Sequence, residues 1–129
     1  MKKVILVLVL ALVSSNVMAE WVRVGSGEDH ILYVENSRIK VSGNKRLVWT
    51  MSDFFNAKTS SSGSYLSTKD KYEIDCFNET VITLIISRYS ENAGKGKRID
   101  LYTYNDRLKY HVTPESLFGV MVDHACNIK

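Results

Sequence analysis

Residues 71–89 read KYEIDCFNETVITLIISRY, and this stretch decides the fold. Residues 71–77 and 80–89 are rich in Ile, Val, Thr and Tyr, which favour strands, and the polar pair Asn78-Glu79 separates them. Alternation places apolar side chains on one face of each segment, namely Tyr72, Ile74 and Cys76 on the first and Ile82, Leu84 and Ile86 on the second. The pattern therefore predicts a buried antiparallel hairpin.

Short strand-favouring stretches separated by polar turns continue on both sides of this hairpin. Residues 42–44 (SGN) and 105–106 (ND) are typical of hairpin turns, because Gly and Asn tolerate positive φ. Residues 59–64 are a polar loop, and residues 90–97 (SENAGKGK) are a glycine-rich basic loop. The further predicted strands are residues 21–24, 31–35, 38–41, 46–55, 65–67, 98–104 and 108–112.

One helix is predicted at the C-terminal end of the chain. Thr113 is a suitable cap, and Pro114 at the first helical position needs no N–H partner. At helical spacing the apolar residues form one stripe, which consists of Leu117, Phe118, Met121, Val122 and Ala125. A stripe of this kind packs on a sheet, so the sequence predicts an α+β fold with the helix on one face of an antiparallel sheet.

The first nineteen residues have the organisation of an export signal. Lys2 and Lys3 precede an unbroken apolar run over residues 4–13, which is too short to span a bilayer. Small residues then lead to a cleavage site between Ala19 and Glu20. We therefore expect a signal peptide over residues 1–19 and one domain over residues 20–129, in a Gram-negative bacterium.

The mature chain is expected to be periplasmic or secreted. Without Lys2 and Lys3, 15 basic residues stand against 14 acidic ones, and this near-neutral balance disfavours a nucleic-acid-binding protein. No later apolar run is long enough to form a transmembrane segment. Glu20 and Trp21 follow the signal in place of a cysteine, so the sequence predicts no lipid anchor.

Cys76 and Cys126 are the two cysteines of the chain, and in an oxidising compartment two such residues most often form a disulfide. With 49 residues between them, the chain-entropy model gives about 4 kcal/mol of stabilisation. The alternative is a redox or nucleophilic cysteine, for which His124 is the one base nearby in sequence. The absence of a CxxC pair favours the structural disulfide.

The sequence resembles the surface-adhesin protein E family of small exported bacterial proteins. The matching elements, in chain order, are residues 21–24 (WVRV), 33–39 (YVENSRI), 48–50 (VWT), 72–76 (YEIDC), 112–116 (VTPES) and 125–126 (AC). The resemblance implies an antiparallel sheet of about six strands, with a C-terminal helix tethered by the two cysteines. It also implies adhesion, through binding of host matrix or serum proteins such as laminin and vitronectin.

No pattern in the chain indicates catalysis or a metal site. His30, His111 and His124 lack the spacing of metal ligands, and the sequence predicts that they are surface or rim residues. The aspartates are scattered, with no hydrolase or phosphate-loop motif, at positions Asp70, Asp75, Asp100, Asp106 and Asp123. We therefore expect a non-enzymatic protein without cofactors.

Two surfaces are candidates for binding a protein partner. Lys95, Lys97 and Arg98 form a basic loop that would suit an acidic partner, although such a loop also serves solubility alone. Exposed tyrosines would suit a binding face of the sheet, because Tyr offers contact area at low entropic cost; the candidates are Tyr102, Tyr104 and Tyr110.

The sequence thus predicts an exported, non-enzymatic, adhesin-like binding protein. The alternative from another class is a periplasmic accessory protein or an inhibitor of an attacking enzyme such as lysozyme. An uncovered sheet face or edge strand would also support a homodimer.

Overall fold

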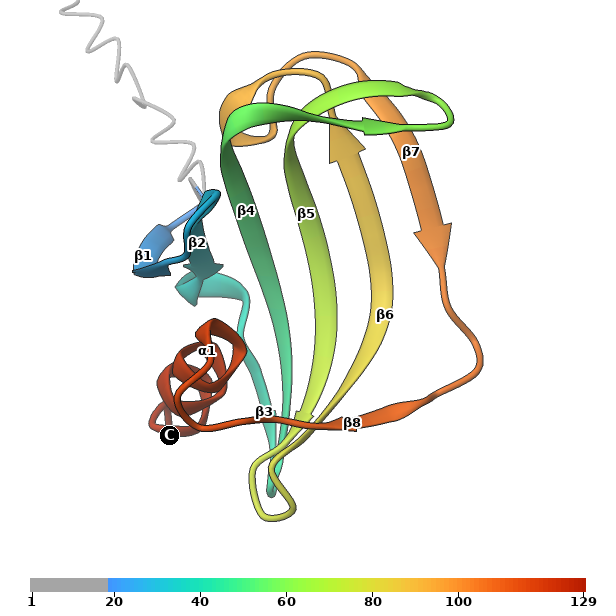
Figure 1. Ribbon diagram of the computed structural model, residues 1–129. Coiled ribbons are helices and arrows are strands. Elements are labelled where there is room, and N and C mark those ends of the chain that lie inside the picture. Colours follow the sequence, from blue (N-terminus) through green and yellow to red (C-terminus); the bar gives the residue numbers. More distant parts are fainter. Residues whose placement is uncertain (1–18) are drawn as a thin grey trace, which may run out of the picture.

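The computed structural model describes residues 19–129, so almost all of the predicted signal peptide lies outside the described residues. Eight strands and one helix make up the domain (Figure 1). The elements are β1 Trp21–Ser26, β2 His30–Glu35, β3 Lys40–Ser42, β4 Lys45–Ser60, β5 Gly63–Asp75, β6 Thr80–Tyr89, β7 Arg98–Thr103, β8 Lys109–His111 and α1 Leu117–Cys126, with short 3₁₀ turns at Asn36–Arg38 and Asn92–Gly94. Within residues 19–129 no helix is long and apolar enough to cross a membrane.

All strand pairs are antiparallel, and the predicted fold class is confirmed. Six strands follow one another across the sheet in the order β1-β2-β4-β5-β6-β7. The count is eight rather than about six because two three-residue strands, β3 and β8, pair beside β4 and β6. The two stretches predicted over residues 65–67 and 71–77 are one continuous strand, β5.

The predicted hairpin is the β5–β6 pair, but the prediction that Ile82, Leu84 and Ile86 share one face of β6 is wrong. Ile74 pairs with Val81 and Tyr72 with Thr83, whereas Lys71 pairs with Ile85, so Leu84 is an extra residue in β6. Such a bulge shifts the alternation by one residue. Val81 therefore joins the core cluster with Tyr72 and Ile74, and Ile82 lies on the opposite face.

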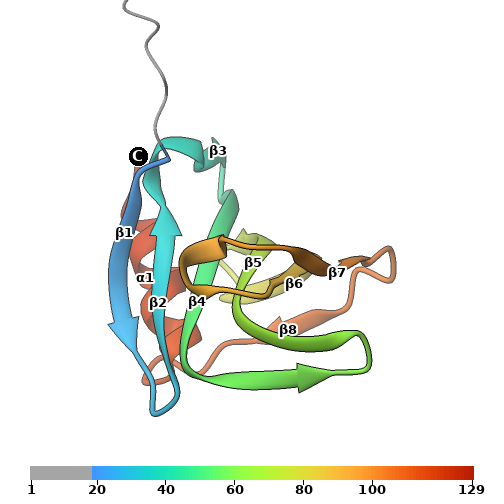
Figure 2. The same cartoon turned by 90° about the horizontal axis from the view of Figure 1, so that it is seen from above.

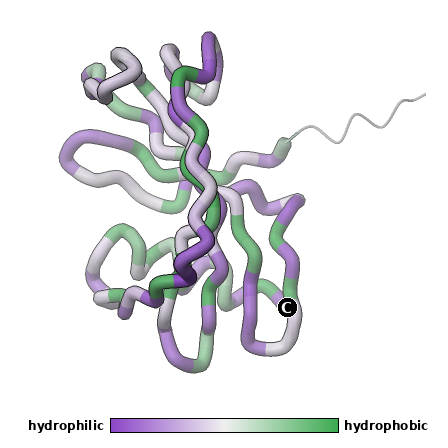
Figure 3. Tube along the Cα trace, turned by 90° about the vertical axis from the view of Figure 1, so that its right-hand side faces the viewer, coloured by the Kyte–Doolittle hydropathy of each residue, from purple (hydrophilic) through white to green (hydrophobic). Residues whose placement is uncertain are grey.

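The long strands bend, and this gives the sheet a concave face. Figures 1 and 2 show β4 and β5 curling at the end where they join, so that their hairpin reaches across toward β7. The pairing of β4 with β5 is irregular between Asp53 and Lys58, where this bend occurs. Along the strands, hydrophobic and hydrophilic residues follow one another at short intervals, as expected for a sheet with two different faces (Figure 3).

Helix α1 packs on the concave side beside β1, β2 and β4 and leaves the β6–β7 side open (Figure 1). Its fully buried residues Met121 and Ala125 contact a core that also contains Val34, Val48 and Ile74. The helix starts later than predicted: Ser116, and not Thr113, is the cap, because its hydroxyl accepts a hydrogen bond from the Gly119 N–H at 3.0 Å.

Two contacts fix the C-terminal end of α1. The predicted disulfide is present and joins Cys76, just after β5, to Cys126 at the end of the helix. Arg46 of β4 is buried, and its guanidinium donates to the carbonyl oxygens of Ala125 at 3.3 Å and Ile128 at 3.1 Å. A cation beside the last carbonyls of a helix also opposes the negative end of the helix dipole.

Candidate functional site

The concave face of the sheet carries regular rows of side chains that run across the strands. One row consists of Val34, Thr50, Asp70, Ile86 and Tyr102, which are successive cross-strand partners. The next row consists of Leu32, Ser52, Thr68, Arg88 and Asp100. Both rows begin with an apolar side chain on β2 beside the helix, carry polar side chains on β4 and β5, and end on β7 with Tyr102 and Asp100.

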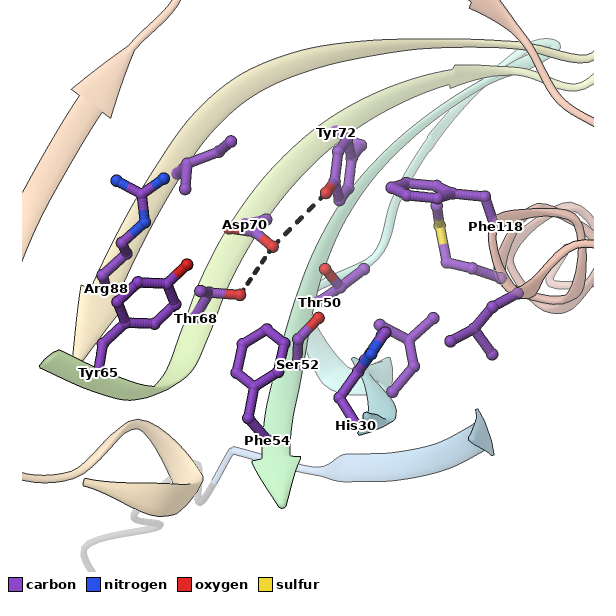
Figure 4. Close-up of a pocket in the computed structure, with 14 residues that line it drawn as sticks. His30, Thr50, Ser52, Phe54, Tyr65, Thr68, Asp70, Tyr72, Arg88 and Phe118 are labelled. Atoms are coloured by element: carbon purple, nitrogen blue, oxygen red, sulfur yellow. Dashed lines mark hydrogen bonds between the residues drawn. The ribbon is translucent and has the colours of Figure 1, made fainter. Parts of the chain in front are cut away.

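A cavity of about 300 Å³ lies between these rows and the helix, with Asp70 on its floor (Figure 4). The Oδ2 atom of Asp70 accepts hydrogen bonds from the Thr68 hydroxyl at 3.1 Å and the Tyr72 hydroxyl at 3.5 Å. Its Oδ1 atom has no hydrogen-bond partner among residues 19–129. Burial raises the pKa of Asp70 from 3.8 to about 7, although both hydroxyls and the positive charge of Arg88 oppose this change.

Arg88 lies beside Asp70 and is already paired. Its guanidinium contacts the Asp100 carboxylate at 3.3 Å and lies over the rings of Tyr65 and Tyr102 at 5.1 and 5.2 Å. Hydrogen bonds from Ser62 and Ser60, together with the contact from Arg88, hold the pKa of Asp100 below its ordinary value. The cavity is therefore lined by one cation, Arg88, and one carboxyl group, Asp70, while Asp100 pairs with Arg88 from outside the lining.

The rim of this cavity near β2 is electrically balanced. Asp29 accepts from Lys58 at 2.6 Å and lies 2.6 Å from the His30 ring nitrogen. The hydrogen bond from Lys58, followed by that from His30, lowers the pKa of Asp29 to about 2. Phe54 packs against the His30 ring and lies under the Lys58 ammonium at 5.4 Å. This group closes one end of the cavity and leaves no acid without a counter-ion there.

Two further cavities continue the surface toward β8. One, of about 320 Å³, shares Phe118 with the first cavity, and another, of about 240 Å³, shares Ile86 with it. These two in turn share Thr83 and Tyr110. The three cavities form one continuous surface, the concave trough, which runs from His30 to Tyr110 between the sheet and α1.

The three candidate tyrosines lie along the open side of the concave trough. Tyr102, Tyr104 and Tyr110 are 40%, 37% and 57% exposed, respectively, as a binding face of the sheet requires. Phe118 of α1 faces them from the other side, with 46% of its surface exposed and its ring edge on Tyr72. The arrangement presents aromatic surface on both walls of a polar floor.

The basic loop lies elsewhere. Lys95 and Lys97 are exposed in the connection from β6 to β7, and Arg98 is the exposed first residue of β7, at the end of the sheet opposite to that of α1 (Figure 1). None of them lines the three cavities of the concave trough. A binding role for these three residues therefore stays a prediction that is independent of the trough.

The histidines occupy three separate places. His30 is on the rim of the first cavity, His111 is exposed on β8, and His124 contacts the Asn36 side chain at 2.7 Å. Within residues 19–129 no group of three or more His, Cys, Asp or Glu side chains is arranged to hold a metal ion.

In the sequence, Asp70 is one of several scattered aspartates. A signal was present, however: Thr68, Asp70, Tyr72 and Ile74 alternate with Lys69, Lys71 and Glu73 along β5. An aspartate that shares a face with Tyr72 and Ile74, opposite a charged face, is expected to point into the protein.

Comparisons with known proteins agree on the fold. Protein E from non-typeable Haemophilus influenzae is similar in structure at 14% sequence identity, with a TM-score of 0.64 over 87% of this chain and 78% of that chain. Another structure of Haemophilus influenzae protein E, also 14% identical, gives a TM-score of 0.62 over 87% of each chain. A search of curated proteins finds no match. The sequence model of surface-adhesin protein E matches residues 21–127, and the chain therefore belongs to the surface-adhesin protein E family.

Proposed function

We propose that this chain is an exported, non-enzymatic binding protein of the adhesin type, which holds a protein partner in the concave trough. The observation that carries the proposal is the continuous trough with exposed aromatic side chains on both of its walls, Tyr102, Tyr104 and Tyr110 on one and Phe118 on the other. Aromatic residues are enriched at the centres of protein interfaces, where they supply large contact areas.

Access to the trough supports this choice over the convex face. Helix α1 lies over β1, β2 and β4 and reaches Tyr72 of β5, so the β7 side is open to a partner (Figure 1). The aromatic rings of the convex face, Trp21, Trp49 and Tyr89, are half-buried and lie beside the Lys69 and Lys71 ammonium groups. Leu101 is exposed on that face, next to Ser87. A single exposed apolar residue of that kind is ordinary for a protein surface.

The partner that we propose is a host extracellular-matrix or serum protein, as for an adhesin. Export through a signal peptide over residues 1–19 would deliver the domain of residues 20–129 to the periplasm or the medium without a lipid anchor. The alternative is a periplasmic accessory protein or an inhibitor of an attacking enzyme such as lysozyme, using the same trough. Cell fractionation with surface proteolysis separates them: a chain that stays wholly periplasmic in intact cells does not contact host proteins.

Binding assays on immobilised laminin, vitronectin and lysozyme test the trough directly. We expect Tyr110→Ala to weaken binding of the mature protein to its partner roughly tenfold or more, as truncation of an aromatic anchor does. Leu101→Ala, an exposed apolar residue on the convex face, is the matched control and is expected to change little.

A variant with Lys95, Lys97 and Arg98 all replaced by Ala separates the two candidate surfaces. If this loop variant loses binding while Tyr110→Ala retains it, the basic loop and not the trough is the binding surface. Light scattering during size-exclusion chromatography of the same samples reports whether a homodimer forms and whether Tyr110→Ala disrupts it.

A further inference from the structure

The floor of the concave trough contains a buried hydrogen-bond acceptor that the protein leaves unused. Asp70 is only 7% exposed, and both of its hydrogen bonds are made through Oδ2. Oδ1 has no partner within residues 19–129, although the residue lines the first cavity (Figure 4). A buried carboxylate oxygen without a donor is costly, and such groups are rare unless a ligand, ion or water supplies the donor.

Charge indicates which kind of donor is missing. Arg88 is the one cation at the floor, and it is paired with Asp100, so Asp70 has no counter-ion of its own. At the rim, Asp29 and Lys58 neutralise each other. A positively charged group in the cavity would balance the remaining carboxylate, whereas an anion would be repelled by Asp70.

The shape of the cavity limits the size of that group. About 300 Å³ is at the lower end of the range for ligand pockets and suits one side chain rather than a large cofactor. Phe54, Tyr65 and Phe118 line the walls above Asp70. Aromatic walls accommodate an alkyl stem and also attract a cation through the faces of their rings.

We propose that this cavity binds the primary ammonium group of a lysine side chain, with Asp70 as its counter-ion. The inference rests on the proposed function only in placing that lysine on a protein partner. The pocket is therefore tested with a small probe and without any partner. Lysine binding can then be refuted while adhesion is supported, and adhesion can be refuted while lysine binding is supported.

The probe is Nα-acetyl-lysine methylamide, and its matched control carries an acetylated, uncharged side chain. In an NMR titration of the mature protein at pH 8, we expect the charged probe to shift the amide signals of Thr50, Asp70 and Tyr72. Asp70→Asn retains the shape of the side chain and is expected to weaken binding roughly ten- to a hundredfold, the range for a hydrogen bond to a charged group.

A second measurement on the unmodified protein does not depend on the folding of a variant. Because the free pocket holds Asp70 with a pKa near 7, the ammonium must displace a proton at lower pH. Affinity is expected to fall about tenfold per pH unit below pH 7 and to level off above it.

The charged or titratable groups that face Asp70 from neighbouring elements are His30, Arg88, Asp100, Tyr65 and Tyr72, while α1 contributes only uncharged side chains. His30→Gln is the control background, because His30 is the histidine that lines the same cavity.

Three outcomes overturn the proposal. The first is equal binding of the charged and acetylated probes, which would indicate an apolar slot. The second is no shift of the three amides at probe concentrations up to about 50 mM, well above the ~1 mM dissociation constant expected of a small ligand held by about 4 kcal/mol. The third is an affinity that does not change between pH 5.5 and 8 in the His30→Gln background.

A different buried acid supports an independent inference about the N-terminus. Glu35 is fully buried, its Oε1 atom accepts a hydrogen bond from the backbone nitrogen of Glu20 at 2.6 Å, and its Oε2 atom has no partner within residues 19–129. Glu20 is the first residue of the predicted mature chain. Hydrolysis of the Ala19–Glu20 bond by an export endopeptidase consumes one water and converts this amide N–H into an ammonium group with three N–H donors.

We infer that cleavage at this bond completes the fold, because the new ammonium group pairs with both oxygens of Glu35. The test compares residues 20–129 bearing a free N-terminus with the same chain bearing an N-terminal acetyl group. The free chain is expected to have an unfolding equilibrium constant at least tenfold lower in urea titrations, and Glu35→Gln is expected to reduce this difference. Equal stabilities of the two chains, or a difference that Glu35→Gln leaves unchanged, would overturn the inference.

Discussion

Asp70 makes the stability of the domain depend on pH, and its replacement by asparagine is predicted to remove that dependence. Burial raises the pKa of Asp70 from 3.8 to about 7 in the folded protein. A carboxyl group whose pKa is higher in the folded than in the unfolded state stabilises the fold when protonated. Its contribution is therefore fully present below pH 3.8 and is lost as the pH rises to 7.

The size of the effect follows from the two pKa values. A tenfold change in proton affinity is 1.36 kcal/mol, so a rise from 3.8 to about 7 corresponds to about 4 kcal/mol of unfolding free energy. This is a large share of the ~5–15 kcal/mol that stabilises a typical domain. Asparagine has the same shape as the protonated acid and no charge to desolvate, so Asp70→Asn is expected to be the more stable protein at pH 7.5 and about equal at pH 4.

Urea unfolding followed by the fluorescence of Trp21 and Trp49 measures this difference between pH 4 and 7.5, with the disulfide intact. Hydrogen bonds lower the pKa values of Asp29 and Asp75 to about 2 in both proteins. Their contributions to the pH dependence of the unfolding free energy are therefore equal and cancel in the difference between the two proteins. Asp123→Asn, at an exposed helix position, is the matched control. A difference between wild type and Asp70→Asn that stays within about 0.5 kcal/mol across this range would refute the reasoning, because it would mean that folding does not desolvate Asp70.

Three further changes test what holds the helix on the sheet, each by urea unfolding at pH 7. Replacing Cys76 and Cys126 by Ala is expected to cost about 4 kcal/mol, because the bridge closes a loop with a sequence separation of 50 residues, and a loss below about 1 kcal/mol would contradict this. Gly119→Ala is expected to lower stability by about 1–3 kcal/mol although Ala favours helices, since its Cβ atom would clash with the Thr113 carbonyl oxygen; an increase in Tm would show that this contact relaxes. Arg46→Met removes the hydrogen bonds to the end of the helix and is expected to cost roughly 2–3 kcal/mol, with Arg46→Lys intermediate, whereas equal stability of Arg46→Met and wild type would mean that those bonds contribute nothing.

The elements that sequence patterns predicted well are those set by neighbouring residues. The β5–β6 hairpin followed from two alternating stretches around a polar turn, and the helix from an apolar stripe at a spacing of 3.6 residues. The disulfide followed from the number of cysteines and the predicted compartment. Boundaries were less accurate, since Ser116 competes with Thr113 for the cap and only the folded chain selects between them.

The candidate site was much less visible in the sequence. Thr50, Asp70, Ile86 and Tyr102 are separated by 16 to 20 residues in the chain and become neighbours only through the register of four strands. The bulge at Leu84 changes which side chains of β6 face the trough, and no turn residue or glycine in the sequence indicates this bulge. Helix α1 then decides which end of the concave face stays open.

The sequence by itself determined the strands, the helix, the cysteine pair and the family, because each depends on spacing along the chain. Only the tertiary structure decided that Asp70 is buried without a counter-ion in an open, aromatic trough. The physical reason is that burial and electrostatics depend on distances through space, which strand register, the bulge and the bend of the sheet set together.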